Sequence, residues 1–198
     1  MIPTMPRSVP PVVPDGTLAD HEQSSLPAGD SLILRPWARR DAGSVLDAFR
    51  EPNIRRWHAR TMDTEDEAVT WIETWEERWR SETDASWAVT GRDDDKVRGY
   101  VALRNISLEF GSASITYWTL APFRRSAVAT DATRAVTDWA FSTLALHRLS
   151  LNHSTMNPIS CQVASKAGFE PEGILRSAML HDDGWHDVHV HGRIHEQT

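Results

Sequence analysis

The stretch from Ser112 to Ser154 constrains the fold most, because its pattern changes type within a short span. SASITYWTL (112–120) is strand-like, DATRAVTDWAF (131–141) has helical spacing, and HRLSLNHS (147–154) is again strand-like. A strand, a helix and a second strand in succession form a crossover within a sheet that helices cover. The chain is therefore predicted to have a mixed α/β fold of the α+β class.

Further elements are predicted on both sides of this crossover. SLILRPW (31–37), ASWAVT (85–90), KVRGYVALRNISL (96–108), EGILRSAML (172–180) and WHDVHVHGRI (185–194) are expected to be strands. Residues 41–50, 64–82 and 157–169 have helical character, and Thr64 with Glu67 has the spacing of a capping box. RRWHART (55–61) is expected to lie in a loop.

Length and composition suit one domain, since 198 residues with 40% hydrophobic content can bury a substantial core. Residues 1–30 hold six of the eleven prolines and have no regular period. They are expected to form a disordered N-terminal arm ahead of a domain at 31–198. The alternative is that apolar residues of the arm dock on the domain or on a partner subunit: Val9, Val12, Val13 and Leu18.

The net charge of -7 opposes non-specific binding to nucleic acid or to an anionic membrane, so neither is expected as a partner. The single cysteine, Cys161, excludes an internal disulfide framework and a cysteine-built zinc site, and it fits a reducing compartment. No apolar run reaches the length of a signal peptide or a membrane span. A cytoplasmic protein is expected.

Several short stretches, in this order, resemble the GNAT superfamily of acyl-CoA-dependent N-acyltransferases. They are LILRPW, ITYWTLAP, the RxxAxA segment from Arg124 to Ala129, TDWAFSTLALHRL, NPISCQVASKAGFEPEG and GWHDV. Within the superfamily, the chain is most similar to the ribosomal-protein-alanine (RimJ/RimL-like) branch. The resemblance implies a splayed mixed sheet of about seven strands flanked by helices, with acetyl-CoA or another acyl-CoA as co-substrate and no metal.

The loop FRRSAVAT (123–130) carries the implied cofactor site. Free backbone N–H groups and the helix dipole at a helix N-terminus favour an anion such as a pyrophosphate. The family motif has glycine at the position of Ala127, and the branch often has glycine at Arg125. The resemblance implies cofactor contacts by Leu120, Arg124, Arg125, Ser126, Ala127, Val128, Ala129, Thr130 and Asn157.

The glycine-free loop leaves three interpretations of the donor site open. In the first, Ala127 slightly alters a working acyl-CoA site, at a cost of about 1 kcal/mol if its φ is positive. In the second, the donor is an acyl carrier protein, which has the pantetheine arm without the pyrophosphate. In the third, the chain is a non-catalytic acyl-CoA-binding module.

The catalytic residues are also implied by the resemblance. Many relatives protonate the departing thiolate with a tyrosine whose position here is occupied by Ala164, so Ser160 is the expected group near the sulfur. The alternative is that Asn157 and Ser160 only cap their helix. The expected bases are Glu109 and His153, and a water chain or a merely buried His153 remain alternatives.

The sequence also contains a cluster of histidines and aspartates and a set of regularly spaced tryptophans. The histidines and aspartates from His181 to His191 do not share one face of a strand, so no metal site is predicted. Trp71, Trp75 and Trp79 form a helical stripe typical of a core, yet Trp57, Trp75 and Trp185 are also candidates for lining the acceptor pocket. The predicted function is transfer of an acyl group from a CoA thioester to a primary amine of a small molecule, a peptide or a protein N-terminus. A homodimer is a further expectation.

Overall fold

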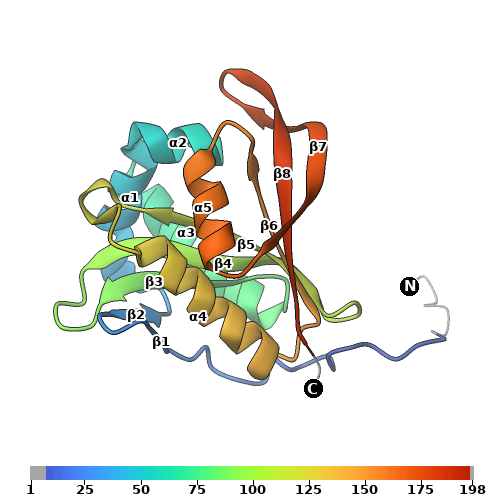
Figure 1. Cartoon of the computed structure of the whole chain (residues 1–198). Coiled ribbons are helices and arrows are strands. Elements are labelled where there is room, and N and C mark those ends of the chain that lie inside the picture. The colour runs from blue at the N-terminus through green and yellow to red at the C-terminus, as the bar shows by residue number, and fades with distance from the viewer. Residues whose placement is uncertain (1–7, 197–198) are drawn as a thin grey trace, which may run out of the picture.

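The structure is a computed structural model that describes residues 8–196. One sheet of eight strands runs through the molecule in the order β1-β2-β3-β4-β5-β6-β8-β7, with helices on both faces (Figure 1). The strands are β1 (Leu26–Ala28), β2 (Leu32–Arg35), β3 (Ala85–Gly91), β4 (Val97–Ser107), β5 (Ser112–Thr119), β6 (Arg148–Ser154), β7 (Glu170–His181) and β8 (Gly184–Ile194). The helices are η1 (Arg39–Asp41), α1 (Ala42–Arg50), α2 (Pro52–His58), α3 (Glu65–Arg80), η2 (Ala121–Phe123), α4 (Val128–Ser142) and α5 (Pro158–Lys166).

Each face of the sheet has its own apolar core. On one face α4 and α5 cover a cluster that includes Val136, Leu149 and Leu151. On the other face α1 and α3 bury an aromatic cluster around Trp75 and Trp118. The amphipathic stripe of α3 explains this, because its buried residues recur every three or four positions, and Thr64 caps it as expected by accepting from the Glu67 N–H at 3.3 Å. None of the helices within residues 8–196 is long and apolar enough to cross a membrane.

The crossover through α4 makes β5 and β6 parallel, while the other neighbouring strands in the described chain are antiparallel. Their pairing runs from Ser112 opposite Arg148 to Ile115 opposite Leu151 and then stops. Both strands continue beyond this point, so a gap opens between them. The predicted α+β fold with a splayed mixed sheet is confirmed.

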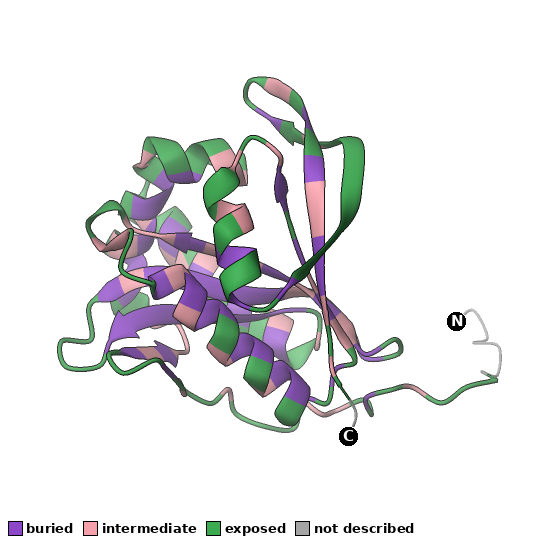
Figure 2. Ribbon diagram, in the orientation of Figure 1, coloured by how far each residue is buried: buried purple, intermediate pink, exposed green. Residues whose placement is uncertain are grey.

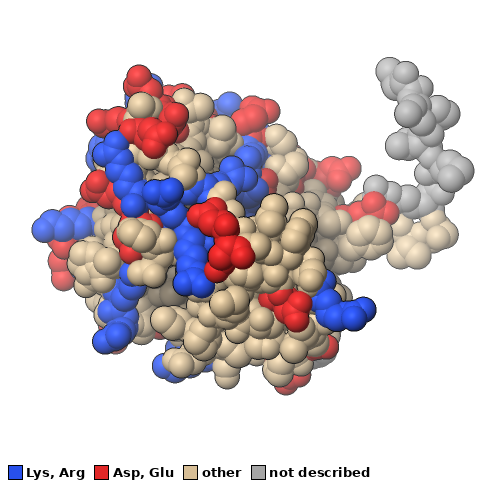
Figure 3. Space-filling model, turned by 90° about the horizontal axis from the view of Figure 1, so that it is seen from above, with Lys and Arg blue, Asp and Glu red and all other residues tan. Residues whose placement is uncertain are grey.

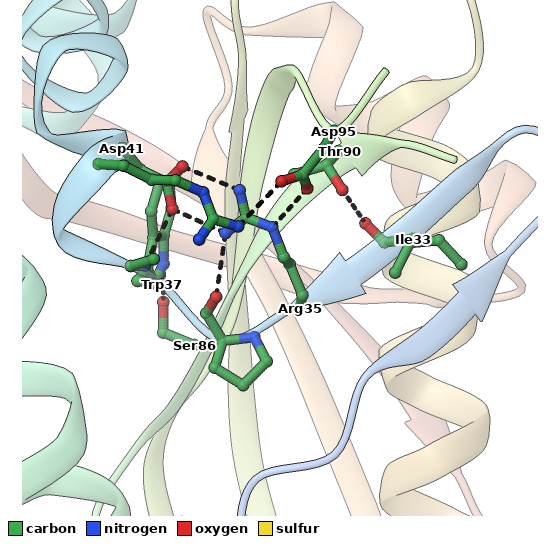
Figure 4. Close-up of polar contacts among 10 residues, drawn as sticks. Ile33, Arg35, Trp37, Asp41, Ser86, Thr90 and Asp95 are labelled. Atoms are coloured by element: carbon green, nitrogen blue, oxygen red, sulfur yellow. Dashed lines mark hydrogen bonds and ion pairs between the residues drawn. The ribbon is translucent and has the colours of Figure 1, made fainter. Parts of the chain in front are cut away.

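The start of the domain is held by a polar cluster around Arg35 (Figure 4). The Arg35 guanidinium donates two hydrogen bonds to the Asp41 carboxylate, at 2.7 and 2.8 Å, and one to Asp95 at 2.7 Å. Trp37 Nε1 donates to Ser86 Oγ at 2.9 Å. A forked pair of this kind fixes direction as well as distance, so β2 turns sharply into η1 and α1.

Residues 8–30 differ from the disordered arm that was expected. Val13 and Leu18 are each 1% exposed and belong to the core under α4. Trp79 Nε1 donates to the His21 carbonyl at 2.8 Å, and Trp87 Nε1 donates to the Ser24 carbonyl at 2.9 Å. The docking alternative therefore describes this segment, and β1 adds the eighth strand to the seven expected. Single apolar side chains that dock without a period leave no signal for a pattern-based prediction.

The segment after α1 is also different, since the expected loop at 55–61 contains most of helix α2. Glu51 caps this helix by accepting from the Asn53 N–H at 3.3 Å, and Pro52 occupies its first position. Ala59, at φ 49°, ends it in the left-handed region. A seven-residue helix with one buried side chain, Ile54, is too short to show a helical period in the sequence.

We predict that the docked arm contributes to stability. Val13→Ala removes two buried methyl groups and is expected to lower the free energy of unfolding by about 2 kcal/mol. Val9→Ala is the matched control, because Val9 is 69% exposed, and it should change stability by less than about 0.5 kcal/mol. Urea denaturation measures both variants. Equal, small effects would mean that the arm does not pack on the domain.

Candidate active site

The gap between β5 and β6 is the centre of the candidate site. Tyr117 and His153 each lie two residues beyond the last paired positions, Ile115 and Leu151. The Tyr117 carbonyl accepts a hydrogen bond from His58 Nε2 at 3.1 Å, and the Thr119 carbonyl accepts one from Arg124 Nε at 3.2 Å. Neither carbonyl is used by β6. The N–H groups of the same residues point to the same side of β5, so the gap offers main-chain donors and acceptors to an extended ligand.

The N-terminus of α4 faces the end of β5 and is open to an anion. Ala127 is its N-cap and has no side chain that could cap the helix, so the N–H groups of Val128, Ala129 and Thr130 have no partner within it. The helix dipole adds a partial positive charge at this point. The side chains of Val128 and Thr130 are buried and anchor the first turn. The structure thus brings the loop residues 124–130 together as expected, with Leu120 at their entry.

The backbone of this loop is strained at both positions where the family favours glycine. Arg125 has φ 64° and Ala127 has φ 61°. A side chain in the left-handed region costs about 1 kcal/mol or more, because Cβ crowds the following carbonyl. The loop keeps the geometry of a glycine loop without its glycines.

The two arginines of the loop have different surroundings. Arg124 forms an ion pair with Glu51, the cap of α2, so it links the loop to the opposite face of the gap. Although burial acts the other way, hydrogen bonds from Arg124 and the Asn53 amide lower the pKa of Glu51. Arg125 is exposed. Of the two arginines, Arg124 forms the ion pair with Glu51 and Arg125 does not.

Charge around this loop differs from that of the whole chain. Lys and Arg gather on the left half of the view in Figure 3, with Asp and Glu among them. This half carries α1, α2 and the loop before α4 (Figure 1). A chain with a net charge of -7 thus presents cationic groups, with acidic groups among them, on the half of the molecule that includes the uncapped N-terminus of α4 (Figure 3).

The helix α5 places the Ser160 hydroxyl near the Tyr117 hydroxyl of β5. Asn157 caps α5, because its Oδ1 accepts from the Ser160 N–H at 3.3 Å. The Ser160 hydroxyl lies near the buried Tyr117 hydroxyl, although the two do not form a hydrogen bond in the structure. Burial raises the pKa of Tyr117 to about 12, partly opposed by Ser160, so this phenol is protonated at neutral pH. Sequence reasoning missed Tyr117, because it looked for a tyrosine on α5 itself.

The two expected bases lie elsewhere. Glu109 is exposed in the turn between β4 and β5, which is roughly 25 Å along the strand from Tyr117. His153 is at the level of the gap, but its side chain is on the α5 face, where its Nδ1 donates to the Ser154 carbonyl at 2.8 Å and its Nε2 lies 3.2 Å from His191 Nε2. Burial lowers the pKa of His153, so its ring is neutral at pH 7. The structure brings neither residue to the side of the gap where α2 lies.

A chain of polar side chains occupies that side instead. The Ser154 hydroxyl lies 2.8 Å from His186 Nδ1, and His186 Nε2 lies 2.9 Å from the Asp183 carboxylate. Since Ser154 Oγ also accepts from the Met156 N–H, its proton is directed to His186, which donates to Asp183. Ser154 and His186 are buried and Asp183 is exposed, so the chain connects the gap to solvent.

The tip of the β7–β8 hairpin contacts α2 across the gap. Arg56 forms an ion pair with Asp183 at 3.2 Å, and its carbonyl accepts from His181 Nδ1 at 2.9 Å. Burial lowers the pKa of the nearby His58 to about 4, so His58 is neutral. The hairpin and α2 together form a rim over this side of the gap.

The three candidate tryptophans divide into two groups. Trp75 is 4% exposed and its ring packs on Trp71 and Tyr100, so it belongs to the core. Trp57 is half-buried on α2 with its ring edge on His181, and Trp185 is 64% exposed on the hairpin. Trp57 and Trp185 therefore lie on the elements of the rim, while Trp75 does not.

The gap between β5 and β6 can accept an extended ligand, and the uncapped N-terminus of α4 beside it can accept an anion. A sequence profile described as "Acetyltransferase (GNAT) domain" matches residues 31–170. The chain belongs to this family.

Similar proteins agree with this assignment. The probable N-acetyltransferase YjcK of Bacillus subtilis is 31% identical over 171 residues, which cover 82% of this chain and 93% of YjcK. Among solved structures, the ribosomal-protein-S5-alanine acetyltransferase from Vibrio fischeri has a TM-score of 0.79 at 18% identity, covering 88% and 98% of the two chains. The spermidine N-acetyltransferase from Vibrio cholerae in complex with CoA and spermine has a TM-score of 0.73 at 20% identity, covering 83% and 95%.

These findings confirm several expectations from the sequence. The chain is a GNAT N-acetyltransferase that uses an acyl-CoA as co-substrate and an amine as acceptor. The expected likeness to ribosomal-protein acetyltransferases is found among its structural neighbours.

Ala127→Gly is predicted to stabilise the protein. Glycine relieves the left-handed strain, and the expected gain is about 1 kcal/mol, or roughly 2–4 °C in Tm. Ala129→Gly is the matched control, because Ala129 lies within α4 and glycine there should destabilise by about 0.5 kcal/mol. Thermal unfolding distinguishes the two. A loss of stability in both variants would contradict the strain at Ala127.

Proposed function

We propose that this acetyltransferase protonates the departing CoA thiolate with Tyr117, supported by Ser160, and removes the amine proton along the chain formed by Ser154, His186 and Asp183. The observation that carries the proposal is the approach of the Tyr117 hydroxyl to Ser160 at the level where β5 and β6 separate. Acyl transfer requires a neutral amine, a polarised carbonyl and a proton for the leaving thiolate.

The donor is held at two places. The pyrophosphate of an acyl-CoA fits the free N–H groups at the start of α4, with Arg125 as the nearby cation. The pantetheine arm runs along the unpaired edge of β5 and hydrogen-bonds the main chain at Tyr117 and Thr119. An acyl carrier protein offers only one phosphate and leaves the pyrophosphate cradle unused, so the geometry favours the acyl-CoA donor.

The Tyr117 hydroxyl suits the role of acid. Its pKa of about 12 keeps the proton on the phenol until a thiolate forms beside it. Transfer of that proton to the thiolate releases CoA as the neutral thiol and leaves the negative charge on the Tyr117 oxygen, which regains a proton before the next turnover. Ser160 lies beside the hydroxyl and can donate a hydrogen bond to the resulting phenolate.

Tyr117→Phe tests this assignment. Loss of the hydroxyl is expected to lower kcat at least tenfold with the KM for acetyl-CoA unchanged, because the proton is needed only after binding. CoA release with a saturating primary amine measures both constants. Tyr100→Phe is the control, since Tyr100 is buried in the aromatic core on the other face of the sheet. If both variants kept wild-type kcat, Tyr117 would not be the acid.

The acceptor amine enters from the opposite side, under the rim. Although burial acts the other way, its own backbone amide, His186 and Arg56 lower the pKa of Asp183, so this carboxylate is ionised and attracts an ammonium group. The amine proton then moves through Ser154 and His186 toward Asp183 and solvent. Trp57 and Trp185 are proposed to contact the apolar part of the acceptor. The acceptor class is a primary amine of a peptide or a small molecule.

Asp183→Asn is predicted to lower kcat/KM about a hundredfold near neutral pH, since a positioned base contributes on this order. Activity should recover as pH rises, because the free amine then needs no base. Asp182→Asn is the matched control, as Asp182 is adjacent and also exposed but takes no part in the hydrogen-bonded chain. A pH–rate profile of Asp183→Asn parallel to that of the wild type would rule out the base role.

A further inference from the structure

Four side chains with metal-ligating atoms converge under α5, apart from the groups assigned to catalysis. His153 on β6 pairs with His189 on β8, and His191 lies two residues further along β8 opposite Leu151. Cross-strand partners and alternate residues share one face of a sheet, so the three imidazoles project together. Cys161, on α5, is the fourth residue of the group, and the four ligand atoms lie within 4.8 Å of one another.

The measured separations are close to those of a tetrahedral zinc site. Zinc bonds of about 2.0–2.1 Å to nitrogen and about 2.3 Å to sulfur place neighbouring ligand atoms roughly 3.3 to 3.6 Å apart. His153 Nε2 lies 3.2 Å from His191 Nε2, and Cys161 Sγ lies 3.8 Å from His191 Nε2. All four ligand atoms lie within 4.8 Å of one another, so side-chain movements of about 1 Å would bring every pair to the tetrahedral separation.

The hydrogen bonds of the cluster also suit a metal. Because the Ser154 carbonyl can only accept, the proton of His153 is on Nδ1, and its Nε2 presents a lone pair toward the other three residues. A carbonyl that fixes the tautomer in this way is a common partner of a metal-ligating histidine. Nδ1 of His189 and Nδ1 of His191 are buried without a hydrogen-bond partner in the described structure. The atom of His191 that faces His153 and Cys161 is Nε2, so Nδ1 of His191 stays unpaired when Nε2 binds the ion.

We infer that His153, Cys161, His189 and His191 bind one Zn²⁺ ion that fastens α5 to β6 and β8. Three imidazoles and one thiolate are borderline and soft donors, which favour zinc over magnesium or calcium. On binding, the Cys161 thiol releases its proton to solvent as the zinc–sulfur bond forms. The four protein ligands leave no open position, so the ion is structural and takes no part in acyl transfer.

The inferred site departs from the metal-free expectation, which considered only residues close together in sequence. Within the group from His181 to His191, only His189 and His191 belong to the cluster, and the fold adds the other two ligands from β6 and α5. Ser160 immediately precedes Cys161 on α5. A zinc ion would therefore also fix the end of α5 that contacts Tyr117.

The test uses the untagged full chain, stripped of metal with a chelator and then titrated with Zn²⁺ against a colorimetric competitor. We expect one Zn²⁺ per chain, a rise in Tm with Zn²⁺, and binding at least tenfold weaker in Cys161→Ser and in His189→Ala. Titration with Co²⁺ should produce a thiolate charge-transfer band in the wild type that Cys161→Ser lacks. Circular dichroism checks that each variant is folded.

Two control variants make the result decisive. His147→Ala removes an exposed histidine outside the cluster and should leave the affinity for Zn²⁺ unchanged. His186→Ala removes a histidine of the chain that ends at Asp183, and it too should retain zinc binding. No binding near one equivalent, equal affinity in wild type and Cys161→Ser, or loss of binding only in His186→Ala would each overturn the inference.

Discussion

The parallel pairing of β5 with β6 ends at Ile115 and Leu151, and this early separation determines where every other functional group must lie. Past that point the main-chain groups of β5 have lost their neighbouring strand, and only a ligand or a side chain can satisfy them. His58 and Arg124 already do so for two carbonyls. The helices α2, α4 and α5 then contribute groups to one gap from three directions, which a fully paired sheet would not allow.

The loop before α4 holds its conformation at the expense of backbone strain. Arg125 and Ala127 adopt left-handed backbone there although neither is glycine, and Arg124 is paired with Glu51. Strain at a functional loop persists only where the surroundings fix the conformation. Here the buried side chains of Val128 and Thr130 do this from one end, and the ion pair does it from the other.

Regular elements were predictable from the sequence because their apolar residues repeat, as in α3 and in the antiparallel strands β3, β4 and β5. Short or irregular segments were not: α2 has one buried side chain, and the arm docks through isolated residues such as Val13. The loop before α4 was predicted as an anion site from its resemblance to the family motif. The roles proposed for Tyr117 and His186, and the proposed zinc ligands, were not predicted, because they depend on strand register, which brings together residues that are distant in sequence. Glu109 shows the reverse, since it is close to β5 in sequence but lies at its far end.

The two edge strands of the sheet, β1 and β7, differ in length, and neither is suited to pairing with a strand of another chain. β1 offers only three residues. β7 offers twelve, exposed along most of its length (Figure 2), but its register with β8 breaks between Pro171 and Gly173 and again between Leu175 and Met179. Pro171 lacks an N–H, and Ser177 with φ 47° turns its N–H to the Asp187 carboxylate. Such interruptions spoil the straight row of donors and acceptors that an incoming strand needs. The long hairpin can therefore reach across to α2 without serving as a template for aggregation.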